Sequence, residues 1–128
     1  GDDWVINGQK WFTSSADGAD FAIVMAVTDP DAPPYARTSM ILVPTDTPGF
    51  RRVRNISIMG EEGSDHNSHA EIMFENCRVP AANLIGDEGA GYKIALSGLE
   101  GGRIGIAAQS LGMANRDAIP QSRLEQRR

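Results

Sequence analysis

The sequence Trp4-Val5-Ile6-Asn7-Gly8-Gln9-Lys10-Trp11-Phe12-Thr13-Ser14 places apolar residues on both sides of an Asn-Gly pair. Asn-Gly between apolar runs favours a two-residue hairpin turn, because both turn residues accept positive φ. Such a turn pairs Trp4 with Trp11. Side chains alternate along a strand, so Trp11 and Thr13 are expected on one face and Phe12 and Ser14 on the other. Each face then carries an aromatic wall beside a hydroxyl, which suits a planar, hydrogen-bonding heterocycle; an ordinary aromatic core is the alternative.

Composition restricts the classes of protein that fit. The chain has 128 residues, of which 41% are hydrophobic and 23% charged, as in a soluble globular domain. The net charge of −5 argues against a nucleic-acid partner or an anionic membrane surface. A single cysteine, Cys77, excludes an internal disulfide and is expected to be a buried structural thiol, which fits an intracellular protein. No apolar run is long enough to suggest a membrane-spanning helix.

The first 85 residues are predicted to be almost entirely strand and turn. Beyond the hairpin, strands are expected over residues 19–27, 38–43, 50–58, 70–74 and 77–79. The run 19–27 is nearly all apolar, which predicts a strand covered on both faces. The predicted fold class is therefore mainly β, an antiparallel barrel or sandwich, followed by one long helix.

Residues 92–113 are predicted to form that helix. Its glycines lie in a stripe beside an apolar face: Gly98, Gly101, Gly102, Gly105 and Gly112. Each interior glycine costs about 1 kcal/mol relative to alanine, so the stripe suggests close approach by another helix or by a ligand. This chain contains no partner helix, which predicts self-association or a loosely held helix. Periodicity fails after Met113, and residues 115–128 are expected to form an atypical, disordered tail.

Motifs for other chemistry are weak. His66 and His69 beside Asp65 are interpreted as solvated loop residues, and no metal site is predicted. Four arginines could meet phosphate or could form a solvated basic edge: Arg37, Arg51, Arg52 and Arg54. The sequence holds neither a Gly-x-Ser-x-Gly elbow nor a Walker loop.

Five ordered segments resemble the acyl-CoA dehydrogenase family. They are Trp4 to Ser14, Ile41-Leu42-Val43-Pro44, Phe74-Glu75-Asn76-Cys77-Arg78-Val79-Pro80, Gly89-x-Gly91-Tyr92 and Leu99-x-x-Gly102-Arg103-Ile104. The resemblance covers about residues 1–114. It implies the family's middle β-domain over residues 1–86 and the first helix of its C-terminal domain over residues 87–114.

The resemblance also implies a flavoenzyme reaction. In the family a carboxylate removes the α-proton of an acyl-CoA thioester while the β-hydride passes to FAD. The family hairpin, laid on this chain without a gap, places its flavin-walling aromatic at Phe12 and its hydroxyl at Ser14, with Trp11 and Thr13 as neighbours. The helix segment from Glu100 through Gly101 and Gly102 to Arg103 is expected to approach the acyl-CoA.

The same resemblance implies that this chain is part of a larger enzyme. The second flavin-binding loop and the usual catalytic glutamate of the family are absent, and Gly102 stands where some members carry that base. No catalytic residue is therefore assigned, and the chain alone is expected to be inactive. The implied partners are acyl-CoA, an electron-transfer flavoprotein or another acceptor, and further copies of the full-length protein. A stand-alone β-barrel binding module without redox activity is the alternative.

Overall fold

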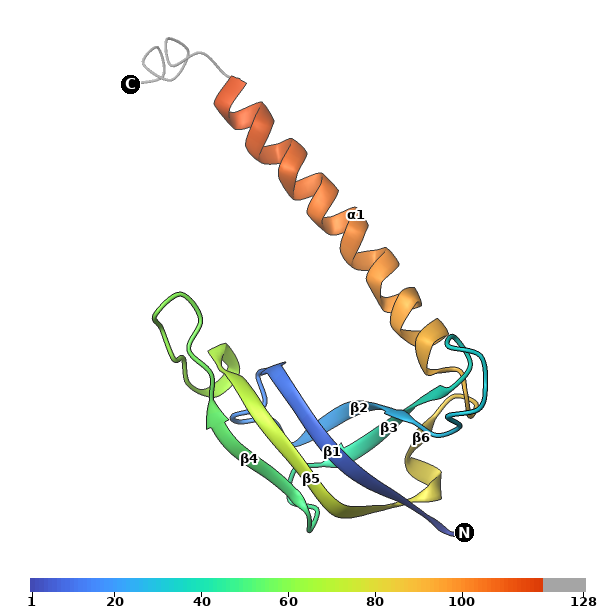
Figure 1. The fold of residues 1–128 in the computed structure, drawn as a ribbon. Coiled ribbons are helices and arrows are strands. Elements are labelled where there is room, and N and C mark those ends of the chain that lie inside the picture. The colour runs from blue at the N-terminus through green and yellow to red at the C-terminus, as the bar shows by residue number, and fades with distance from the viewer. Residues whose placement is uncertain (119–128) are drawn as a thin grey trace. The chain divides into compact units, whose positions relative to one another are not determined.

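The computed structural model describes residues 1–118 and divides at Tyr92 into two units. The first unit, Gly1–Tyr92, carries all the strands of the described residues (Figure 1). Its elements are β1 (Asp3–Ser14), β2 (Phe21–Val27), β3 (Thr38–Pro44), β4 (Phe50–Asn55), the 3₁₀ turn Asp65–Asn67, β5 (His69–Pro80), the 3₁₀ turn Ala81–Asn83 and β6 (Leu84–Ile85). One helix, α1 (Gly91–Ala118), begins at the end of this unit and makes up the described part of the second.

The strands form two antiparallel sheets of three strands each. One has the order β1-β5-β4 and the other the order β2-β3-β6. All the strand pairs within residues 1–118 are antiparallel. The predicted class, mainly β followed by a long helix, is confirmed.

The predicted hairpin at Asn7-Gly8 is wrong. Residues 3–14 form one continuous strand, β1, which pairs along its whole length with β5. Trp4 lies opposite Val79 and not opposite Trp11. Pairing with β5 joins many more backbone groups than a hairpin between two short arms, so the long-range pairing prevails over the local turn signal.

Asn7 and Gly8 instead lie at a β-bulge. Between the pairs Ile6–Cys77 and Gly8–Phe74, β5 holds one residue more than β1, and Asn76 in that segment has φ +50°. The Asn7 Oδ1 atom accepts a hydrogen bond from the Asn76 backbone N–H at 2.8 Å, while Gly8 has φ +139°. An extra residue of this kind sharpens the local twist, and a left-handed conformation suits asparagine and glycine.

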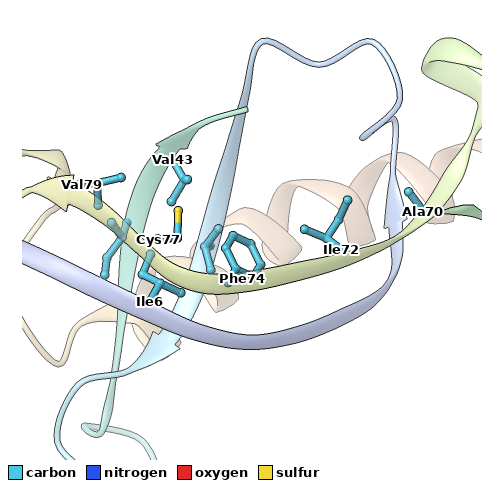
Figure 2. Close-up of a cluster of buried hydrophobic side chains, with 9 residues drawn as sticks. Ile6, Val43, Ala70, Ile72, Phe74, Cys77 and Val79 are labelled. Carbon is cyan, nitrogen blue, oxygen red and sulfur yellow. The ribbon is translucent and has the colours of Figure 1, made fainter. Parts of the chain in front are cut away.

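The core lies between the two sheets. Ile6, Ile72, Phe74, Cys77 and Val79 come from β1 and β5, and Val24, Ile41 and Val43 come from β2 and β3. Figure 2 shows Cys77 and Val79 on the side of β5 that faces Val43. Cys77 is fully buried and free, as expected for a structural thiol, and burial raises the pKa of that thiol.

Strand β2 departs from the expectation of burial on both faces. Val24 points into the core, but Ile23 and Val27 are more than half exposed. A continuously apolar run of strand length predicts cover on both faces. Within residues 1–118, only its inner face is covered.

The helix is longer than predicted, since α1 continues past Met113 to Ala118. The first residue of α1, Gly91, has no room for a side chain, because a Cβ there would lie 2.8 Å from the Thr38 carbonyl oxygen. Beyond that point a Cβ on any glycine of the stripe would meet open space, and Leu99 and Ile106 are exposed. No described helix is long and apolar enough to cross a membrane. The rest of the expected disordered tail, residues 119–128, lies outside the described residues.

We predict that Ile72→Ala destabilises the fold far more than Ile23→Ala. Ile72 is 1% exposed and Ile23 is 57% exposed. Loss of the buried side chain is expected to lower the free energy of unfolding by about 2–5 kcal/mol, against less than about 1 kcal/mol for the exposed one. Urea unfolding of both variants measures the difference, and equal losses would contradict the assigned core.

Candidate functional site

A second bulge in β1 positions the aromatic residues singled out in the sequence. Lys10 pairs with Ile72 and Thr13 with Ala70, so Trp11 and Phe12 together lie opposite one residue of β5. Phe12 takes φ +53°, which is rare for a bulky residue and marks the bulged position. The predicted alternation of Trp11 and Phe12 between opposite faces is therefore broken at this point.

The bulge leaves both aromatic rings accessible. Trp11 is 52% exposed and Phe12 is 54% exposed. Their ring centroids are 6.0 Å apart with an interplanar angle of 63°, an edge-to-face arrangement. Two adjacent half-exposed aromatic rings form a surface on which a planar ligand could stack.

A buried carboxylate supports this aromatic pair. Glu71, which is 8% exposed, accepts a hydrogen bond from Arg54 Nε at 2.7 Å and another from Gln9 Nε2 at 2.5 Å. The guanidinium carbon of Arg54 lies 5.4 Å from the Trp11 ring centroid, within the range of a cation–π interaction. Arg54 thereby joins a buried anion to an exposed aromatic ring.

Sequence reasoning left the role of Arg54 open and missed Glu71 and Gln9. Arg54 was one of four arginines that could form a basic edge. The structure gives it a specific partner, because β4 pairs with β5 and sets Arg54 opposite Glu71. Spacing along the sequence does not reveal this network, because Gln9, Arg54 and Glu71 lie on three different strands.

The two hydroxyl residues at the end of β1 differ in their surroundings. Ser14 Oγ lies 3.0 Å from His69 Nδ1 in a hydrogen bond whose donor depends on the imidazole tautomer. Thr13 lines two clefts, of about 240 and 320 Å³, that also share Phe50. Trp11 lines the smaller cleft and Ser14 the larger one. The structure thus brings Trp11, Thr13 and Ser14 to adjoining hollows at one end of β1.

The loop after β1 is tied to β4 by charge and hydrogen bonding. Asp17 Oδ2 accepts a hydrogen bond from Asn55 Nδ2 at 2.9 Å, and Arg52 lies 3.4 Å from Asp17 Oδ1. The Asn55 hydrogen bond, assisted by the Arg52 charge, lowers the pKa of Asp17 below its usual value. This link holds the chain just past Ser14 against the neighbouring strand.

The helix residues singled out in the sequence belong to the second unit. Glu100, Gly101, Gly102 and Arg103 are exposed, and a Cβ on either glycine would meet open space. Among residues 1–118 no group of three or more His, Cys, Asp or Glu residues could hold a metal ion. The described geometry therefore places the stronger candidate site at the end of β1.

Comparison with known proteins agrees with this architecture. The pattern of the acyl-CoA dehydrogenase middle domain matches residues 1–77. The chain belongs to the acyl-CoA dehydrogenase family. Over 120 residues it is 48% identical to the probable acyl-CoA dehydrogenase FadE2 of Mycobacterium tuberculosis, a match that covers 91% of this chain and 28% of the relative.

Solved structures with a similar sequence show the same fold. A probable acyl-CoA dehydrogenase from Mycobacterium abscessus matches with a TM-score of 0.76 at 35% identity, over 91% of this chain and 30% of that one. A structure described as the electron transferring flavoprotein of Acidaminococcus fermentans contains a chain that matches with a TM-score of 0.74 at 42% identity, over 90% and 29%. This acyl-CoA dehydrogenase family chain thus spans less than a third of the length of these relatives.

We predict that Arg54→Ala perturbs Trp11 as well as stability. Removal of the guanidinium leaves the buried Glu71 carboxylate with fewer donors, at an expected cost of about 1–3 kcal/mol. It also removes the cation that faces the indole, so the fluorescence of Trp11 should change.

The measurement uses a Trp4→Phe background, which leaves Trp11 as the sole indole. In this background Arg54→Ala should alter the emission, whereas Arg51→Ala, the matched control, should not. Arg51 pairs with the exposed Glu75 and not with Trp11. Identical spectra for both variants would contradict the network.

Proposed function

We propose that this chain is the flavin-contacting part of an FAD-dependent acyl-CoA dehydrogenase. The observation that carries the proposal is the bulge at Phe12, which exposes an aromatic pair beside two hydroxyl residues within the segment that matches the family's middle domain. In the enzyme, these residues would help to hold FAD, which would supply the acceptor for the β-hydride of the acyl-CoA. Residues 1–86 would form the middle β-domain and residues 87–114 the first helix of the C-terminal domain.

The residues at the end of β1 fit an isoalloxazine in chemical type. Phe12 provides an exposed aromatic ring, and the half-exposed Trp11 ring lies beside it at an interplanar angle of 63°. The Ser14 hydroxyl can donate one hydrogen bond and accept others, so its contact with His69 leaves capacity for a ring nitrogen or carbonyl. Thr13 adds a second hydroxyl in the adjoining cleft.

On the substrate side, the proposal assigns contacts with acyl-CoA to the helix segment Glu100–Arg103. An arginine at the end of this segment could pair with a substrate carboxylate or phosphate, and the neighbouring glycines admit close approach of a ligand. No residue of this segment is assigned as the base that removes the α-proton. An electron-transfer flavoprotein or another acceptor would reoxidise the flavin, and the full-length enzyme would be an intracellular homo-oligomer.

Substitutions at Phe12 and Ser14 test the flavin role in a whole-enzyme context. We suggest a chimera in which residues 1–77 replace the matching segment of the M. tuberculosis relative. Phe12→Ala should weaken FAD binding about ten-fold, because aromatic stacking on a heterocyclic base contributes about 1–3 kcal/mol. Ser14→Ala should slow flavin reduction by removing a hydrogen bond to the isoalloxazine.

Tyr35→Ala is the matched control, since Tyr35 is an exposed aromatic residue that lies in the loop between β2 and β3 and not in β1. It should leave FAD content and reduction rate unchanged. Normal flavin content and turnover in both site variants would refute the assignment of Phe12 and Ser14.

The chain alone is predicted to lack dehydrogenase activity. General-base removal of the α-proton requires a positioned carboxylate, and the family resemblance implies that Gly102 stands where some members carry one in this helix. Assays with acyl-CoA, FAD and an artificial electron acceptor should give no turnover above a protein-free blank. Turnover that disappears in Glu100→Gln would overturn this prediction and make Glu100 the base.

A further inference from the structure

Strand register places His69 beside the hydroxyl that is proposed to contact flavin. The pair Ser14–His69 ends the antiparallel ladder of β1 and β5, next to the pair Thr13–Ala70. Ala70 is fully buried in the core, and side chains alternate along a strand, so His69 belongs to the outer face of the sheet. Residues that lie directly opposite each other share a face, so the side chains of His69 and Ser14 are neighbours there.

Hydrogen bonds fix the backbone on both sides of this pair. The Ser15 N–H donates to the Ser68 carbonyl oxygen at 2.9 Å. The Ile56 N–H, just past β4, donates to the His69 carbonyl oxygen at 2.6 Å. His69 is thus held opposite Ser14 by the chain on either side, and the 3.0 Å contact between Ser14 Oγ and His69 Nδ1 is made within this framework.

The imidazole of His69 is engaged by Ser14 and not by the charged groups nearby. Within residues 1–118, Ser14 is the one hydrogen-bond partner of its ring nitrogens, and no ion pair includes it. Glu71, two residues further along β5, accepts its hydrogen bonds from Arg54 and Gln9. His69 therefore lies beside that network without being part of it.

A hydrogen bond to the imidazole restricts the Ser14 hydroxyl and leaves it able to bind. A serine side chain has three staggered rotamers, and a partner fixed in one direction favours one of them. The hydroxyl carries one proton and two lone pairs, so its contact with Nδ1 leaves at least one position for a second hydrogen bond. A hydroxyl that is held in place before a ligand arrives has less conformational entropy to lose on binding.

We propose that His69 is a positioning residue, which holds the Ser14 hydroxyl in the orientation that meets the isoalloxazine of FAD. The inference rests on the proposed flavin role of Ser14, because every effect of His69 on the flavin passes through that hydroxyl. Two variants separate the contact from the imidazole itself. Asparagine carries a donor and an acceptor at about the reach of Nδ1, so His69→Asn retains the contact, whereas His69→Ala removes it.

Nitrogen NMR of the 128-residue chain tests the contact without flavin. In protein with isotopically labelled histidine, Ser14→Ala should shift the Nδ1 resonance of His69 and leave both ring resonances of His66 unchanged. His66 is the matched control, because it is exposed and Ser15 contacts its carbonyl oxygen and not its ring. An unchanged Nδ1 resonance of His69 would overturn the proposal, and it would leave the flavin roles of Phe12 and Ser14 to their own tests.

Flavin reduction in the chimera that carries residues 1–77 tests the consequence. His69→Ala should slow reduction by up to about ten-fold, the effect of one lost hydrogen bond, and His69→Asn should restore most of the rate. The double variant with Ser14→Ala should be no slower than Ser14→Ala alone, whereas a merely structural role of His69 would slow it further.

The same rates distinguish failure of this inference from failure of the flavin role. A normal rate in His69→Ala together with slow reduction in Ser14→Ala would overturn the positioning role alone. Normal rates in both variants would refute the flavin role of Ser14 and the positioning role with it.

Discussion

The pairing of β1 with β5 is the interaction on which the rest of the structure depends. Each strand has 12 residues, and together they carry Ile6, Ile72, Phe74, Cys77 and Val79 into the core. The register shifts by one residue near Gly8 and shifts back near Phe12, so that both ends of the pair are aligned in the same way. Without the second shift, every side chain after it would face the opposite side of the sheet.

These two bulges have different consequences. The first is held by Asn7, whose side-chain oxygen accepts a hydrogen bond from the Asn76 backbone N–H, and it contains only the polar residues Asn7, Glu75 and Asn76. The second gathers Trp11 and Phe12 opposite Glu71 and leaves both rings half-exposed. Bulges are common beside functional sites because they redirect side chains that regular pairing would bury or separate. The candidate flavin surface is thus a product of strand register.

The sequence was sufficient to predict the fold class, the helix and most strand positions, but not the partner of β1. Hydrophobic patterning and turn residues are local, and they marked residues 38–43 and 92–113 well. The Asn7-Gly8 pair is compatible with both a turn and a bulge, and only the distant β5 decides between them. The residues at the end of β1 were singled out by their aromatic and hydroxyl side chains, and the family resemblance added their expected flavin role, whereas Glu71 and its contact with Arg54 depend on a strand pairing that no local pattern specifies.

Nuclear Overhauser effects can show whether residues 3–14 form one bulged strand against β5. We predict cross-strand contacts from Ile6 to Cys77 and from Thr13 to Ala70, with none between the backbones of Trp4 and Trp11. Contacts between Trp4 and Trp11, with those to β5 missing, would show a hairpin and refute the bulged strand.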